Sequence, residues 1–235
     1  IDRSLVGSEM CIRDRNDTEI ETPLNYKIRK AVNPKNSPAL ILLHGYGSNM
    51  LDLFALNHFF SESWTIISLQ GPVTTAFGGF AWAELDFSNL RELPSPQEKV
   101  ESIEKIHKSI SIFSKSLDLD KNNIFILGFS QGADLALSTS FKFPNTFKGI
   151  MALCGYFDIK KIDYKIDENA MKKLNLFLCS AIYDEKVPVH LGRMTNLSLK
   201  NLGLETTYHE YETGHTISNQ CLNDMLDWLE KLNLS

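Results

Sequence analysis

The feature that most constrains the fold is an apolar, β-branched run that ends in a Gly-x-Ser-x-Gly motif and continues at once into helix-forming residues. The run begins at Ile124, and the motif reads Gly128-Phe129-Ser130-Gln131-Gly132. Where a strand turns sharply into a helix, the central serine takes a strained backbone conformation. Side chains two positions before and after it would then collide, which explains the two glycines. We therefore predict a strand–turn–helix unit with Ser130 at its turn.

Ser130 is a candidate nucleophile because of this predicted position. It would lie at the N-terminus of the following helix, where the helix dipole stabilises developing negative charge. The motif alone also fits a glycine-rich turn without any chemistry. The interpretation therefore depends on which partners the rest of the chain supplies.

The composition limits the classes of protein to which the chain can belong. It has 235 residues, of which 43% are hydrophobic and 23% are charged, as expected for one globular domain with a single large core. A net charge of −5 and an isoelectric point near 5.7 argue against a surface that binds nucleic acid or anionic membranes. No apolar run approaches the roughly 18 residues of a membrane span. We expect no nucleic-acid partner and no integral membrane segment.

The first fifteen residues do not read as part of the folded domain. It starts with Ile1, and the stretch from Ser4 to Arg15 (SLVGSEMCIRDR) resembles translated sequencing-adapter read-through. We therefore expect residues 1–15 to be a non-native or disordered leader and residues 16–235 to form a single domain.

Cysteine usage indicates the redox environment. Cys11, Cys154, Cys179 and Cys221 show neither a CxxC motif nor another paired spacing. Cys179 lies in an apolar run and Cys154 just after one, where a reduced cysteine packs as a small hydrophobe. We expect a reducing, cytoplasmic location without structural disulfides. A targeting leader stays an open alternative if the native start of the chain is missing.

Strand-like and helix-like segments alternate along the chain. The strands read as short apolar runs, the first of them as an edge strand, and the helices show apolar residues three or four positions apart. Strands are predicted over residues 26–31, 39–43, 64–69, 124–129, 149–153, 176–180 and 205–212, and helices over residues 50–60, 98–117, 188–201 and 217–232 and directly after Ser130. Residues 70–96 form a connection of a length that is usually functional. This order predicts an α/β fold whose mainly parallel sheet carries helices on both faces, with active groups at the carboxyl ends of the strands.

A serine nucleophile needs a base within hydrogen-bond reach and a carboxylate that orients the base. His215 lies between the last predicted strand and the last helix, at the same sheet edge as Ser130. Asp184 follows the strand over residues 176–180 and reaches that edge too, with its neighbour Glu185 as the main alternative. The order Ser130, Asp184, His215 is that of α/β hydrolases. We expect structural or surface roles for the other five histidines, His44, His58, His107, His190 and His209.

Such a site also needs backbone donors for the negative oxygen of a tetrahedral intermediate. The N–H of Gln131, directly after the nucleophile, is one candidate. The other is the N–H of Tyr46 in the turn His44-Gly45-Tyr46-Gly47-Ser48, which follows an earlier predicted strand. A simple glycine turn without chemistry is the alternative for this segment.

Five segments carry a resemblance to a known family. They are Leu42-Leu43-His44-Gly45-Tyr46-Gly47, Gly79-Phe80-Ala81-Trp82, Gly128-Phe129-Ser130-Gln131-Gly132-Ala133, Asp184-Glu185-Lys186-Val187-Pro188 and Gly214-His215. Together they resemble the phospholipase/carboxylesterase family of α/β hydrolases, which includes acyl-protein thioesterases and small bacterial carboxylesterases. The resemblance covers roughly residues 39–232.

The resemblance implies an α/β-hydrolase fold and hydrolysis of small-molecule carboxylic esters or thioesters, without a metal or any other cofactor. It also implies a substrate pocket that includes Trp82, Lys186 and Val187. Two residues depart from the family pattern, since Ala83 stands where an aromatic residue is common and Lys186 where an apolar one is common. A cation beside the site disfavours long lipid chains, so we expect short or partly anionic acyl groups.

Two other functions stay open on the sequence. An acyltransferase or a lactone-type hydrolase would use the same three side chains, whereas a non-catalytic receptor or scaffold of this fold would need none of them. The sequence does not identify the natural acyl substrate, and it leaves a homodimer open.

Overall fold

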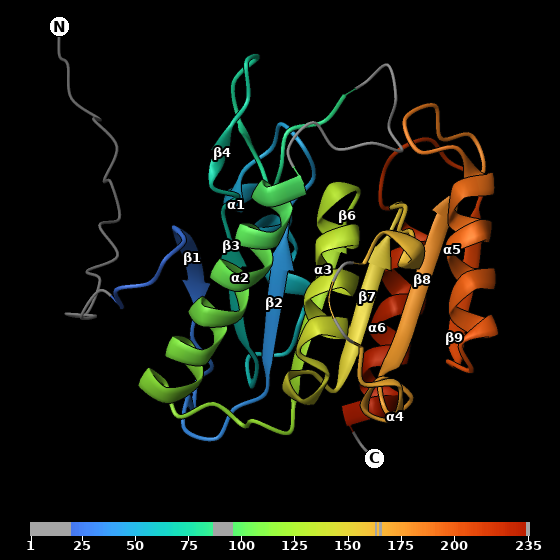
Figure 1. The fold of residues 1–235 in the computed structure, drawn as a ribbon. Helices are drawn as coiled ribbons and strands as arrows, with labels where there is room; N and C mark the ends of the chain where they lie inside the picture. Colours follow the sequence, from blue (N-terminus) through green and yellow to red (C-terminus); the bar gives the residue numbers. More distant parts are fainter. Residues whose placement is uncertain (1–19, 87–95, 163, 165, 234–235) are drawn as a thin grey trace, which may run out of the picture.

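A seven-stranded sheet forms the centre of the protein (Figure 1). The computed structural model describes residues 20–86, 96–162, 164 and 166–233, so the predicted leader lies outside the described residues. The strands of the sheet are β1 (Tyr26–Arg29), β2 (Ala39–Leu43), β3 (Thr65–Leu69), β6 (Ile124–Phe129), β7 (Gly149–Leu153), β8 (Asn175–Ala181) and β9 (Thr206–Tyr211). Their spatial order is β1-β3-β2-β6-β7-β8-β9.

The strand directions confirm the predicted mainly parallel sheet. β1 pairs antiparallel with β3 at one edge, and all other pairs are parallel. Every residue of β2, β3 and β7 is buried, as expected for strands covered on both faces.

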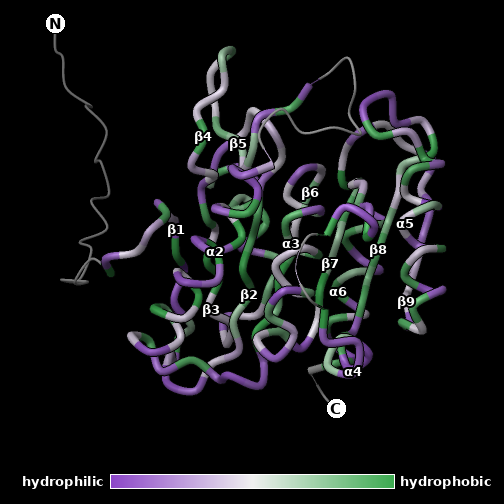
Figure 2. Tube along the Cα trace, in the orientation of Figure 1, coloured by the Kyte–Doolittle hydropathy of each residue, from purple (hydrophilic) through white to green (hydrophobic). Residues whose placement is uncertain are grey.

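Helices cover both faces of the sheet. One face carries α2 (Pro96–Ser116), α3 (Gln131–Lys142) and α5 (Val189–Asn201), and the other carries α1 (Met50–Phe54) and α6 (Asn219–Asn233). Successive strand residues point to opposite faces, so Ile41 joins the core under α2, α3 and α5, whereas Leu42 joins the core under α1 and α6. Figure 2 shows this pattern as hydrophobic central strands between helices with one polar side.

The carboxyl ends of the parallel strands meet at one edge, which is the upper edge in Figure 1. The turns that follow β2, β6, β8 and β9 therefore lie along the same rim. These are the segments in which the sequence analysis places Tyr46, Ser130, Asp184 and His215.

Two of the predicted segments have a different structure from the one expected. The helix expected over residues 50–60 is α1 followed by a 3₁₀ helix, η1 (Ala55–Phe59). The long connection contains a hairpin of β4 (Val73–Thr74) and β5 (Phe80–Ala81), whose turn uses Gly78 and Gly79 at positive φ. Two-residue strands are too short to show an apolar alternation in sequence. Residues 87–95 of the connection lie outside the described residues.

The remaining short helices lie between β6 and β8. They are η2 (Pro144–Thr146), η3 (Ile159–Lys161) and α4 (Glu168–Met171). The side chains of Asp158 and Asp167 cap η3 and α4 by accepting hydrogen bonds from the backbone N–H groups of Lys160 and Ala170, respectively.

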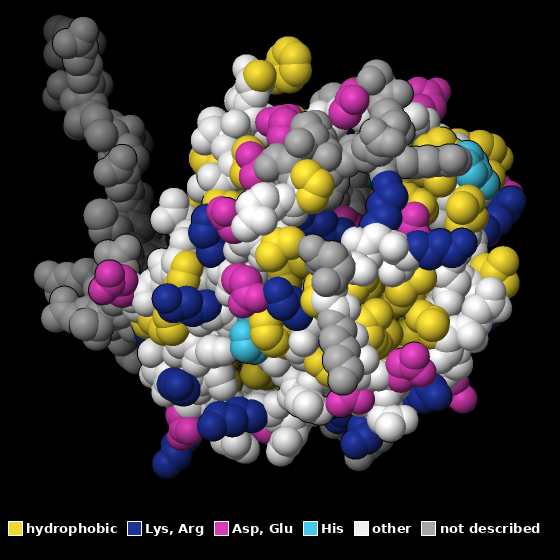
Figure 3. All heavy atoms as spheres, viewed as in Figure 1, with side chains coloured by type: hydrophobic (Ala, Val, Ile, Leu, Met, Phe, Trp, Pro, Cys, Tyr) yellow, Lys and Arg dark blue, Asp and Glu magenta, His cyan; other side chains and the backbone are white. Residues whose placement is uncertain are grey.

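Charged side chains of both signs are interspersed over the face of the molecule shown in Figure 3. None of the helices in the described parts of the chain combines the length and apolar character needed to cross a bilayer. Cys154, Cys179 and Cys221 are buried free thiols, with the sulfur atoms of Cys179 and Cys221 3.4 Å apart.

Candidate active site

Ser130 sits in a strained turn between β6 and α3. Its φ is 55° and its ψ −119°, a conformation that costs a residue with a side chain on the order of 1–3 kcal/mol. The flanking glycines allow the turn. A Cβ atom on Gly128 would lie 2.0 Å from the carbonyl oxygen of Gly132, and one on Gly132 would lie 2.1 Å from that of Leu43. The predicted steric reason for both glycines is therefore confirmed.

The structure brings the three predicted catalytic side chains together. His215 follows β9, and its Nε2 atom lies 2.9 Å from Oγ of Ser130. Asp184 follows β8, and its Oδ2 atom lies 2.6 Å from Nδ1 of His215. Because a carboxylate only accepts hydrogen bonds, it keeps the proton on Nδ1 and leaves Nε2 free to accept the serine proton.

Asp184 is held in place by its own turn. Its Oδ1 atom accepts hydrogen bonds from the backbone N–H groups of Lys186 at 2.9 Å and Val187 at 2.8 Å. Its side chain has no exposed surface, whereas Glu185 is exposed. The geometry thus favours Asp184 over its neighbour as the partner of His215.

Both segments proposed to supply oxyanion donors lie against Ser130. Gln131 is the first residue of α3, and the first N–H groups of a helix have no acceptor within the helix. The turn after β2 approaches from the other side, since a Cβ atom on Gly45 would lie 3.3 Å from Cβ of Ser130. The N–H of Gly47 donates to the carbonyl of Phe80 at 2.9 Å and ties this turn to the hairpin. The donor roles of Tyr46 and Gln131 remain predictions.

His44 lies in the core of this turn. Its Nε2 atom accepts a hydrogen bond from the N–H of Gly71 at 3.0 Å, so the ring proton is on Nδ1, which donates to the carbonyl of Gly45 at 2.7 Å. Desolvation by burial lowers the pKa of His44, while the hydrogen bond to Gly45 and the charge of Asp52 act in the opposite direction. A neutral imidazole therefore fixes the turn, in keeping with the structural role expected for it.

Trp82 is not where the resemblance implies. It is fully buried, and its indole N–H donates to the carbonyl of His44 at 2.8 Å. It is absent from the described residues that line the pocket beside Ser130. Its position between β5 and the turn after β2 makes it a support for that turn, and we correct its assignment to the pocket accordingly.

The side chain of Gln131 has a role that the sequence analysis missed. Its Oε1 atom accepts from the N–H of Trp82 at 2.9 Å, and its Nε2 atom donates to the carbonyl of Ala83 at 2.6 Å. The amide thus joins the start of α3 to the segment after β5. Gln131 is 49 positions from Trp82 and 48 from Ala83, so only the tertiary fold brings them into contact. The Gly-x-Ser-x-Gly motif gave no signal of this side-chain role.

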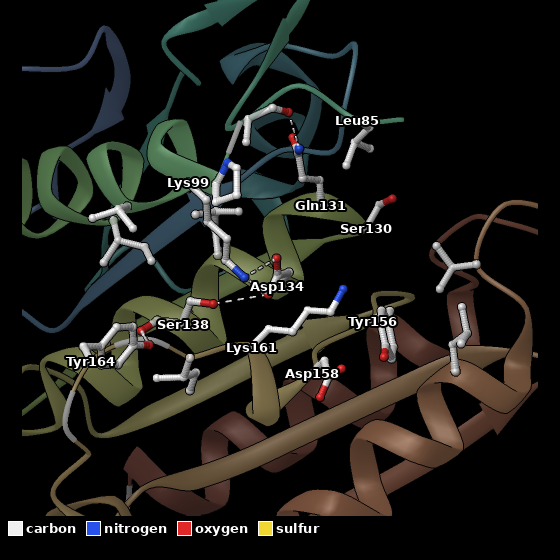
Figure 4. Close-up of a pocket in the computed structure, with 18 residues that line it drawn as sticks. Leu85, Lys99, Ser130, Gln131, Asp134, Ser138, Tyr156, Asp158, Lys161 and Tyr164 are labelled. Carbon is white, nitrogen blue, oxygen red and sulfur yellow. Dashed lines mark hydrogen bonds and ion pairs between the residues drawn. The ribbon is translucent and has the colours of Figure 1, made fainter. Parts of the chain in front are cut away.

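A pocket of about 500 Å³ opens beside Ser130 (Figure 4). It extends from the serine between α2, α3 and the segment after β7. Most of its wall is apolar, contributed by residues such as Ile103, Leu135, Tyr164, Val187 and Leu191. Its size lies in the range of small-molecule sites.

Of the three residues expected in the pocket, Val187 lines it and Trp82 and Lys186 are not among its described lining residues. Lys186 is exposed, and it serves the site through its backbone N–H to Asp184. The cations that do line the pocket are Lys99 and Lys161. The sequence analysis missed both, because α2 and η3 reach the site only through the tertiary fold.

No group of three or more His, Cys, Asp or Glu side chains within the described ranges is arranged to hold a metal ion.

Comparisons with known proteins agree with this architecture. Residues 27–233 match the model of the phospholipase/carboxylesterase family. Lysophospholipase-like protein 1 from Mus musculus is 25% identical over 207 residues, which cover 83% of this chain and 87% of that protein. Acyl-protein thioesterase 1 from Yarrowia lipolytica is 26% identical over 171 residues, 69% of this chain and 74% of the relative.

Among solved structures, esterase PE8 superposes with a TM-score of 0.77 at 24% identity, over 89% of this chain and 99% of that one. This likeness shows the α/β-hydrolase fold, as the sequence motifs imply. With the family match covering nearly all of the described residues, the chain belongs to the phospholipase/carboxylesterase family.

Proposed function

We propose that this protein hydrolyses carboxylic esters or thioesters through a covalent acyl-enzyme on Ser130. The observation that carries the proposal is the continuous line of hydrogen bonds from Ser130 through His215 to the buried carboxylate of Asp184. Membership of a family of ester and thioester hydrolases supports the same reaction class.

The first half of the reaction forms the acyl-enzyme. Nε2 of His215 takes the proton of the Ser130 hydroxyl as the oxygen attacks the acyl carbonyl, and the carbonyl oxygen becomes negatively charged. The N–H groups of Gln131 and Tyr46 stabilise that oxygen, each donor contributing about 3 kcal/mol to the transition state. His215 then gives its proton to the departing alkoxide or thiolate as the bond between carbonyl carbon and leaving group breaks.

The second half releases the acid. His215 takes a proton from water, whose oxygen attacks the acyl carbon. The bond to Ser130 breaks, and His215 returns the proton to the serine oxygen. Asp184 stabilises the imidazolium in both halves and keeps its own charge.

The pocket fits the acyl group rather than the leaving group. A leaving group must lie next to His215, which protonates it, yet His215 is not among the described residues that line the pocket. Ser130 and Gln131 do line it, so a chain attached to the reacting carbonyl carbon can enter directly. Its apolar wall favours the hydrocarbon part of an acyl chain.

Hydrolysis of p-nitrophenyl esters, from acetate to palmitate, tests this proposal. We expect turnover of esters whose acyl chain fits the pocket, with the free acid as product. The same assay with added methanol or a thiol distinguishes a hydrolase from an acyltransferase. Predominant transfer of the acyl group to a dilute acceptor would contradict the proposal, as would the absence of turnover across the whole series.

A further inference from the structure

We propose that the pocket selects acyl groups that carry an anionic group, and that Lys161 binds this group. The inference rests on the proposed function, because it assigns the pocket to the acyl part of the substrate. It differs from the expectation drawn from sequence, which placed the selecting cation at Lys186.

Three of the four charged side chains that line the pocket within the described ranges already have partners. Nζ of Lys99 lies 2.7 Å from both carboxylate oxygens of Asp134, and Ser138 also donates to Asp134 at 3.2 Å. The carboxylate of Asp158 accepts the N–H of Lys160 at 3.0 Å and caps η3. Among the charged pocket residues within the described ranges, Lys161 alone has a side chain without a hydrogen-bond or ion-pair partner.

The side chain of Lys161 is directed at the site. It lies at the end of η3, and Figure 4 shows it extending into the pocket with its ammonium group toward the end where Ser130 lies. Asp158, which belongs to the same turn, is drawn with its carboxylate directed away from that ammonium group. An acyl chain bound to Ser130 would therefore pass a free positive charge.

The apolar wall makes that charge selective. Ile103, Leu135 and Leu191 can cover the methylene groups of a chain but offer nothing to an anion. A carboxylate in this pocket needs a cationic partner to offset its lost hydration, and Lys161 can supply one. Because Lys161 itself is exposed, water and salt weaken the pairing, so the expected selectivity is modest.

Two pairs of esters test the inference. Each pair consists of a p-nitrophenyl monoester of adipic or suberic acid and the same ester with the far carboxylate replaced by a primary amide. The two esters of a pair have nearly the same shape and differ in charge. We expect wild-type protein to favour the carboxylate by about two- to fivefold in kcat/KM for at least one chain length, as for a solvated ion pair. The preference should fall as sodium chloride is added.

Variants separate charge from packing. Lys161→Met keeps an apolar stem without the ammonium group, so it should reduce the ratio of carboxylate to amide ester to about one. Lys161→Glu should invert the ratio. Lys160→Met, which changes the neighbouring exposed lysine outside the pocket, should retain the wild-type ratio.

The outcomes that refute the inference are distinct from those that refute the proposed function. A wild-type ratio of one or less for both chain lengths, or a ratio that survives Lys161→Met, would overturn the role of Lys161 while leaving ester hydrolysis intact. Wild-type protein that hydrolysed neither the acidic nor the amide esters would refute the proposed function, and the inference with it.

Discussion

Replacing Ser130 with alanine is expected to lower kcat for ester hydrolysis by at least about 10⁴-fold. The hydroxyl is the atom that attacks the acyl carbon, and it lies 2.9 Å from the base. Alanine leaves His215 and the backbone donors in place but offers no oxygen to form an acyl-enzyme. Steady-state hydrolysis of a preferred p-nitrophenyl ester measures the loss.

The backbone at this position supplies a control for folding. Ser130 has a positive φ, which glycine adopts without strain, so Ser130→Gly should be as inactive as Ser130→Ala and about 1 kcal/mol more stable. Thermal unfolding monitored by circular dichroism measures the difference. Activity in either variant within tenfold of wild type would contradict the nucleophile assignment.

Replacing Asp184 with asparagine is expected to reduce kcat by about 10⁴-fold with little change in fold. The carboxylate accepts the proton of His215 Nδ1 at 2.6 Å. An asparagine can instead present an N–H to the ring and stabilise the tautomer in which Nε2 already carries a proton. That tautomer cannot accept the proton of Ser130. The pH profile of kcat for the variant and wild type measures the effect.

Glu185 provides the matched control for this prediction. It carries the same charge at the next position but is exposed. Glu185→Gln should therefore keep kcat within about twofold of wild type, as for an ordinary surface substitution. A large loss in Glu185→Gln together with an active Asp184→Asn would show that the neighbouring carboxylate orients the base.

Local sequence predicts the parts of the site that local geometry determines. The turn at Ser130 follows from the two glycines, because adding Cβ to either would place it within about 2 Å of a carbonyl oxygen. The parallel strands follow from continuous apolar runs, and the connectivity of parallel strands brings the turns after β8 and β9 to the same edge as Ser130. That rule brings Asp184 and His215 to the edge that carries Ser130, whereas the choice of Asp184 over Glu185 needed the burial that the structure shows.

Contacts between distant segments could not be predicted in the same way. Lys161 reaches the pocket because η3, which follows β7 after a short connection, packs beside α5, and no periodicity encodes that approach. The same limit explains Trp82, whose place in the core depends on the hairpin of two-residue strands. Its apolar ring could equally have lined the pocket or packed beneath the turn after β2.

The central claim is that Ser130 becomes a nucleophile through His215 and Asp184. Covalent labelling with a fluorophosphonate probe, followed by intact-protein and peptide mass spectrometry, tests it most directly. The account predicts one label on the wild-type protein, carried by Ser130, and none on a folded Ser130→Ala variant. A label on another residue, or one that persists in Ser130→Ala, would contradict it.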